Sequence, residues 1–156
     1  MKKFLLIYLL ALLFLFAIFY WNLSPIANSI NLWQINLSSF LTSLTLPEHA
    51  MKENLIFINT QLTLVIDKAC NGLIPYFFLL ASIIAFPSEM KHKIKWAMLS
   101  YLILSILNIF RIWFITKLVI NSENNFSLAH DYLGNLFLVF SSMILFIAFI
   151  RTKKHS

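Results

Sequence analysis

Three residues of types that can perform chemistry lie near the ends of different hydrophobic segments of this 156-residue chain: Cys70, Arg111 and His130. A cysteine thiolate can attack a carbonyl carbon, and a histidine can carry the protons that the attack and the leaving group require. An arginine can bind the negative charge that develops on the carbonyl oxygen. These residue types predict cleavage and transfer of an acyl group, provided that the fold brings them together.

The composition predicts the class of protein in which these residues act. Hydrophobic residues make up 60% of the sequence, aromatic residues 16% and charged residues only 12%, which is far from the soluble average. We therefore predict an all-α integral membrane protein with a single domain, residues 1–156. The net charge is +6, but the basic residues cluster at the ends of hydrophobic segments instead of forming one face, so we expect no nucleic-acid partner.

The sequence lacks the motifs of most cofactor and metal sites. Its two glycines, Gly72 and Gly134, are too few for a glycine-rich nucleotide loop. A single cysteine excludes an intramolecular disulfide and a CxxC redox pair. The four histidines are scattered without metal-ligand spacing. We therefore expect no cofactor and no metal ion.

Four hydrophobic segments are predicted to cross the membrane: residues 4–21, 69–86, 96–120 and 133–150. The first is typical of a signal anchor, although Ala27 and Ser29 also offer the small residues of a signal-peptidase site. In the second segment Pro75 is compatible with a first helical turn, where a backbone N–H has no partner within the helix.

The basic residues predict the orientation of these segments. Both termini and the loop between the second and third segments carry clusters of positive charge, and four crossings place all three on one side: Lys2, Lys3, Lys91, Lys93, Lys95, Arg151, Lys153 and Lys154. By the positive-inside rule this side is the cytoplasm. Glu89 excepted, the acidic residues fall on the other side. We therefore expect residues 22–68, and the ends at which the three chemical residues lie, to be extracytoplasmic.

The extracytoplasmic segment 22–68 carries two patterns. Apolar residues recur at helical spacing, with amides and serines between them, from Ile26 to Leu44. This pattern predicts an amphipathic helix lying in the membrane interface, ended by Pro47, which serves either as a cap of the bundle or as a lid or docking surface for substrate. Residues 55–66 are rich in Ile, Phe, Val and Thr, which is compatible with a small hairpin leading to Cys70.

Each chemical residue also has an ordinary structural interpretation. Cys70 precedes the start of a predicted helix, where the helix dipole favours a thiolate, but a membrane cysteine is commonly a small packing residue. Arg111 inside an apolar helix costs at least about 2.5 kcal/mol on insertion scales, and Asn108 on the same face could orient it. The arginine could also extend to the lipid headgroups.

His130 precedes the fourth segment, with Gly134 one turn later on the same face, where it would admit a neighbouring helix. The helix dipole disfavours an imidazolium there, whereas the adjacent Asp131 favours one. A histidine in this position is also commonly a surface or capping residue.

The order of the motifs points to a family. The chain contains CNG at 70–72, NxxR at 108–111 and HxxxG at 130–134, in the longer contexts ACNG, LNIFRI and AHDYLG. Over residues 65–140 it resembles the exosortase/archaeosortase family of membrane cysteine transpeptidases, and most closely its short bacterial members such as the exosortase H type. The four predicted spans are fewer than in larger exosortases.

The resemblance implies a processing enzyme in the bacterial inner membrane. Its partners would be secreted precursors that end in a recognition motif, a transmembrane helix and a basic tail. Cys70 would form a thioester with the precursor, His130 would transfer protons and Arg111 would stabilise the oxyanion, with Gly72, Asn108 and Gly134 in support. The protein would then be released by an envelope acceptor, for which a lipid-linked group is one alternative, or by water.

A second interpretation is a non-enzymatic membrane scaffold or transporter subunit, in which Cys70, Arg111 and His130 form a structural polar cluster. No second polar stripe marks an ion path in the sequence. A serine or rhomboid-like protease is less favoured, because Ser82, Ser100 and Ser105 have no histidine at a comparable depth.

Overall fold

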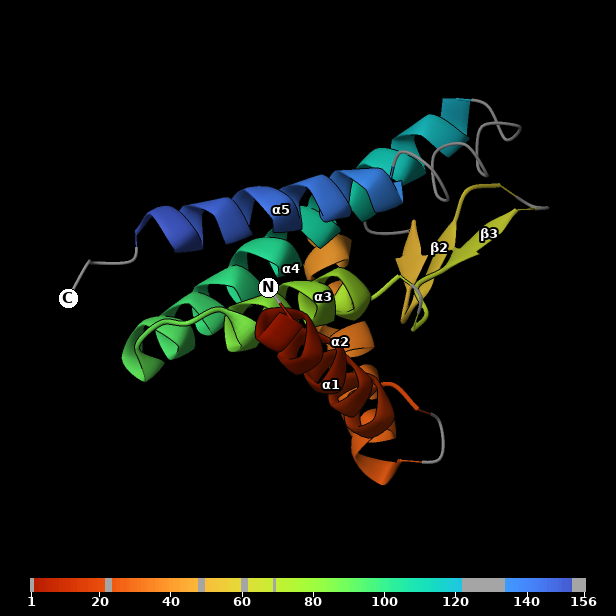
Figure 1. The fold of residues 1–156 in the computed structure, drawn as a ribbon. Coiled ribbons are helices and arrows are strands. Elements are labelled where there is room, and N and C mark those ends of the chain that lie inside the picture. Colours follow the sequence, from red (N-terminus) through yellow and green to blue (C-terminus); the bar gives the residue numbers. More distant parts are fainter. Residues whose placement is uncertain are drawn as a thin grey trace.

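Five helices and a small sheet make up the described part of the computed structural model, which is residues 2–21, 24–47, 50–59, 62–68, 70–121 and 134–152. The helices are α1 (Lys2–Phe19), α2 (Pro25–Ser43), α3 (Leu73–Ala85), α4 (Met90–Asn121) and α5 (Asn135–Arg151). The strands β1 (Met51–Lys52), β2 (Leu55–Phe57) and β3 (Thr63–Val65) form one antiparallel sheet in the order β1-β2-β3. The sheet lies beside the C-terminal half of α4 (Figure 1).

Helix α3 is central, because it packs against α1, α4 and α5. One of its faces buries Leu73, Phe77 and Ala81 against Leu15 of α1. Another buries apolar residues in a second cluster with α4 and α5, whose buried members are Leu79, Ile83, Leu104 and Phe149. Burial on several sides explains why nearly all residues of α3 are apolar.

The lengths of the helices agree only in part with four predicted crossings. Helix α1 and residues Met90–Ile120 of α4 are each long and apolar enough to cross a membrane. Helices α3 and α5 are apolar but shorter, with 13 and 17 residues. At 1.5 Å per residue α3 is only about 20 Å long, compared with about 30 Å for the hydrocarbon core.

Helix α3 is shorter than the predicted segment 69–86 for local reasons. Gly72 has a left-handed backbone with φ 77°, and the side-chain oxygen of Asn71 accepts a hydrogen bond from the Leu73 N–H at 3.0 Å, so the helix begins at Leu73. Phe86 is extended, as expected for a residue before proline, and ends it.

Helix α4 begins at Met90, six residues before the predicted start at 96. The three lysines that we expected in a loop, Lys91, Lys93 and Lys95, therefore lie in its first turns. Pro87, Ser88 and Glu89 precede them and are typical of a helix N-terminus, and lysine itself favours helix.

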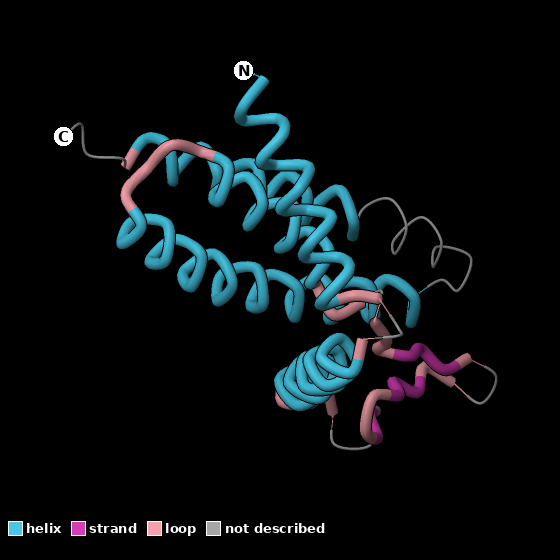
Figure 2. The backbone as a smooth tube through the Cα atoms, turned by 60° about the horizontal axis from the view of Figure 1, so that its bottom comes forward, coloured by secondary structure: helices cyan, strands magenta, loops and turns pink. Residues whose placement is uncertain are grey.

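Helix α2 forms where the spacing predicts a helix, and the structure shows which of its residues are buried. Five of its polar residues face the bundle and are buried: Asn31, Gln34, Ser38, Ser39 and Thr42. Its exposed residues are mixed, with the apolar Ile26, Leu32, Trp33 and Phe40 beside the polar Asn28, Ser29, Asn36 and Ser43. A membrane protein can expose apolar side chains to lipid, whereas amides need partners that the lipid lacks. Figure 2 shows α2 nearly end-on, so it crosses the direction of α4.

Residues 55–66, whose composition is compatible with a small hairpin, contain β2 and β3. Ile56 of β2 pairs with Leu64 of β3. Ile56 is only 1% exposed and packs in a cluster with Ile66 and with Ile112 of α4. The sheet is therefore attached to α4 by its apolar face. This attachment brings the chain segment after β3, which contains Cys70, close to α4.

Candidate functional site

Cys70 lies in the short connection between β3 and α3 and is partly exposed. Its backbone N–H donates to the backbone oxygen of Asp67 at 3.1 Å and to the side-chain oxygen of the same residue at 3.3 Å. Its carbonyl oxygen accepts a hydrogen bond from the side-chain nitrogen of Asn108 at 2.9 Å. Helix α4 therefore holds the backbone of Cys70 directly.

Gly72 allows this contact between the loop and α4. A Cβ atom at this position would lie 3.0 Å from Cγ of Asn108 and 3.2 Å from its Cβ. Its φ of 77° also falls in the region that side chains other than glycine rarely adopt. The CNG sequence thus requires glycine at position 72 for two reasons, the left-handed turn and the close approach of Asn108.

Arg111 is almost completely buried, with 3% of its surface exposed. Its guanidinium donates to the side-chain oxygen of Asn135 at 3.0 Å and to that of Asn108 at 3.4 Å. These two amide oxygens orient the guanidinium from α4 and α5. Asn108 therefore links two of the predicted site residues, since it donates to Cys70 and accepts from Arg111.

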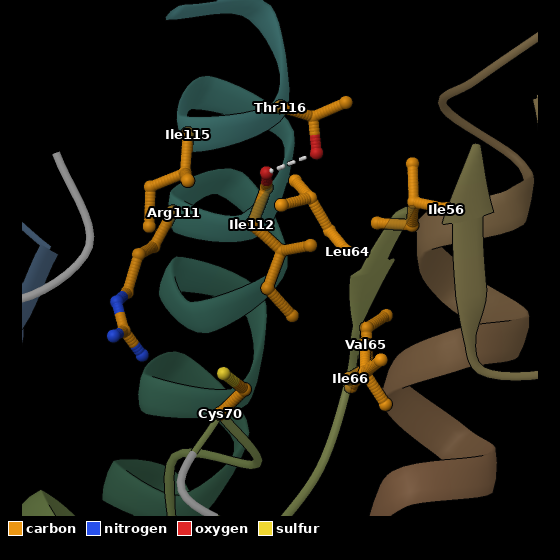
Figure 3. Close-up of a pocket in the computed structure, with 9 residues that line it drawn as sticks. All are labelled: Ile56, Leu64, Val65, Ile66, Cys70, Arg111, Ile112, Ile115 and Thr116. Atoms are coloured by element: carbon orange, nitrogen blue, oxygen red, sulfur yellow. Dashed lines mark hydrogen bonds between the residues drawn. The ribbon is translucent and has the colours of Figure 1, made fainter. Parts of the chain in front are cut away.

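Cys70 and Arg111 line the same pocket, between β3 and α4. The pocket has a cavity volume of about 50 Å³, and its other lining residues are Ile56, Leu64, Val65, Ile66, Ile112, Ile115 and Thr116. Figure 3 shows the Cys70 thiol and the Arg111 guanidinium on the same side of α4. A cavity of this size has room for a few atoms, such as a peptide group.

The surroundings of the pocket favour negative charge. Most of its lining is apolar, so the positive charge of Arg111 is screened less there than in water. Cys70 also precedes the N-terminus of α3, where the helix dipole is positive. The arrangement can therefore stabilise an oxyanion, the charged species that forms on the carbonyl oxygen in nucleophilic acyl transfer.

The predicted proton carrier, His130, lies outside the described residues, as does Asp131. Gly134 directly precedes α5 and is buried, with a right-handed backbone at φ −65°. Asn135, the first residue of α5, was not singled out from the sequence. The feature of the sequence that could have identified Asn135 is its position, an amide at the start of an apolar segment and directly after the HxxxG motif.

Among the residues that the structure describes, no group of three His, Cys, Asp or Glu side chains could hold a metal ion. Of the site residues predicted from the sequence, the structure brings together Cys70, Gly72, Asn108 and Arg111. The amides of α2, which the sequence placed in an interfacial helix, reach the same loop from the other side.

The fold and this pocket define a helical membrane protein with a cysteine and a buried arginine at one site. Residues 2–147 match the model of the family described as Transmembrane exosortase. The chain belongs to this family. No match was found among curated proteins or among solved structures.

Proposed function

We propose that the chain is a membrane cysteine transpeptidase that removes C-terminal sorting tails from secreted precursors and transfers the precursors to an envelope acceptor. Family membership supports this class of activity. The observation that carries the assignment of residues is that Cys70 and Arg111 line one pocket and are joined through Asn108. We assign no cofactor to the reaction.

In the proposed reaction the Cys70 thiolate attacks the scissile carbonyl, and Arg111 donates hydrogen bonds to the oxyanion. The C–N bond then breaks, His130 gives a proton to the leaving amine, and a thioester remains on Cys70. The acceptor, a lipid-linked amine or hydroxyl among the candidates, gives its proton to His130 and attacks the thioester. This attack forms the new bond to the carbonyl and releases the Cys70 thiolate.

We place this reaction on the extracytoplasmic side of the bacterial inner membrane, with both termini in the cytoplasm. Two views support this placement, because the sheet lies at one end of the molecule and the C-terminal end of α5 at the other, beside the turn between α3 and α4 (Figures 1 and 2). His92 after that turn contacts the backbone oxygen of Phe149 at 3.2 Å. The lysines beside His92 and Arg151 at the end of α5 therefore lie at the proposed cytoplasmic end.

The test is to co-express the chain with a precursor that ends in a motif, a transmembrane helix and a basic tail, and to follow the size of the precursor. Cys70→Ala and Cys70→Ser should abolish processing while the protein still reaches the membrane. The matched control is Thr116→Val, which alters the same pocket but removes only a hydroxyl that donates to Ile112 within α4. Processing by the Cys70 variants would remove Cys70 as the nucleophile.

A scaffold without enzymatic activity is the second candidate. It is favoured by the same buried hydrogen bonds, because amide partners for Arg111 would also serve a purely structural cluster. In that case Cys70→Ala would keep the biological function of the chain, whereas substitutions of Arg111 would prevent its accumulation.

A further inference from the structure

The buried amides of α2 lead directly to the residue after Cys70. Asn71 is fully buried, at 0% exposed. Its side-chain nitrogen donates to the side-chain oxygen of Asn31 at 2.7 Å, and its backbone oxygen accepts from the side-chain nitrogen of Gln34 at 3.1 Å. Both the side chain and the backbone of Asn71 are therefore held by α2.

These two amides are themselves fixed by further hydrogen bonds. The hydroxyl of Tyr101, on α4, donates to the side-chain oxygen of Gln34. The side-chain nitrogen of Asn31 donates to the backbone oxygens of Phe19 at 3.0 Å and Ala27 at 2.7 Å. Gln34 and Asn31 are 2% and 6% exposed, so water competes little for these bonds.

Asn31, Gln34 and Tyr101 do not line the pocket that contains Cys70 and Arg111. We propose that Asn31, Gln34 and Tyr101 are positioning residues, which act through Asn71 to hold Cys70 at the pocket. Asn108 holds the carbonyl of Cys70 from α4, and the three residues hold the adjacent peptide from α2. The expected effect on turnover rests on the proposed function, whereas the expected effect on the position of Cys70 does not.

The physical reason for such a network is the precision that nucleophilic attack requires. A displacement of about 1 Å at the reacting atoms can lower a rate about a hundredfold. The connection that carries Cys70 contains Gly72, and glycine restrains the backbone less than other residues do. Hydrogen bonds from two helices supply the missing restraint.

The sharpest test compares two tyrosines that pack edge-to-face, with ring centroids 5.3 Å apart. Tyr101→Phe removes the hydroxyl that holds Gln34 and keeps the ring. Tyr76→Phe removes a hydroxyl that donates instead to the backbone oxygen of Ala97 at 3.3 Å. The two variants lose the same group from one pair of packed rings, and only Tyr101 is connected to Asn71, through Gln34.

For the purified full-length chain with a tailed precursor, we expect Tyr101→Phe to lower kcat about fivefold and to leave KM unchanged, because the hydrogen bond that fixes Gln34 is lost together with the one to Ser105. Tyr76→Phe should keep the wild-type kcat. Gln34→Leu, which also removes the bond to Asn71, should lower kcat further. Equal effects of the two tyrosine substitutions, or none from either, would overturn the proposal.

A second readout does not depend on turnover. Cys70 is the single cysteine of the chain, so alkylation by a small neutral maleimide reports on it alone. Tyr101→Phe and Gln34→Leu should accelerate alkylation about threefold by loosening the loop that carries Cys70. Tyr76→Phe should not accelerate it. The comparison is made between variants that have equal melting temperatures. If wild type processes no precursor, the proposed function fails for that precursor, and the alkylation rates still decide whether these residues position Cys70.

Discussion

At the scale of single residues, Asn108 explains how the site is assembled. Its amide has both a donor and an acceptor, and it uses the donor for Cys70 and the acceptor for Arg111. An aspartate could not donate to the carbonyl, and a leucine could do neither. The NxxR spacing is therefore a geometric requirement, because it places the amide and the guanidinium on one face of α4.

Arg111→Ala should lower the rate of precursor processing about a hundredfold to a thousandfold, the usual effect of losing one oxyanion donor. The cause would be the loss of the buried positive charge from the pocket. Processing of a tailed precursor measures the rate, and the amount of variant in the membrane is measured in parallel.

The matched control is Lys117→Ala, which removes an exposed cation from the same helix and should leave processing unchanged. If Arg111→Ala does not accumulate in the membrane while Lys117→Ala does, Arg111 is structural. If Arg111→Ala accumulates and processes the precursor at the wild-type rate, its role as an oxyanion donor is wrong.

At the scale of elements, the start of α3 controls how closely the Cys70 loop approaches α4. Gly72 provides the turn into α3 and leaves space for Asn108. Helix α5 adds Asn135 from a third direction, so the guanidinium of Arg111 joins α4 to α5. The site thus depends on where helices begin, which sequence patterns define least well.

Gly72→Ala should destabilise the protein by about 1–2 kcal/mol from the left-handed backbone alone, with a further cost from the contact with Asn108. Gly134→Ala is the matched control, because Gly134 has a right-handed backbone that alanine adopts readily. Thermal unfolding of the detergent-solubilised variants measures both. Equal unfolding temperatures for the two variants would contradict the role assigned to Gly72.

At the scale of the whole molecule, the chain separates a polar site from a largely apolar exterior. Exposed leucine, isoleucine and phenylalanine side chains cover the outward faces of α1, α4 and α5. The buried amides gather instead where α2, α3 and α4 meet near Cys70. This distribution suits a protein whose exterior contacts lipid and whose polar groups satisfy one another.

The proposed orientation predicts which side of the membrane reaches Cys70. In intact spheroplasts a membrane-impermeant maleimide should label wild type, because the proposed orientation places Cys70 on the outer side. A Cys70→Ser chain that also carries Glu89→Cys, an exposed position in the turn between α3 and α4, should be labelled only after permeabilisation. The reverse pattern would show that the topology is inverted.

The sequence alone determined the class of this protein and predicted two residues, Cys70 and Arg111, that line one pocket. Its apolar composition required a membrane protein, since water would not tolerate so much exposed apolar surface. The CNG and NxxR motifs predicted residues that the structure brings together, because their spacing is local and each lies in or beside one helix. The HxxxG motif remains a prediction for His130, which lies outside the described residues.

Only the tertiary structure decided which face of α2 is buried and what its amides contact. A pattern of alternating polar and apolar positions gives the period of a helix but does not say which side faces lipid. Asn31, Gln34 and Arg111 each have at least one partner outside their own helix, at a separation of 24 to 67 residues. Such contacts depend on how helices cross, and local spacing carries no information about that geometry.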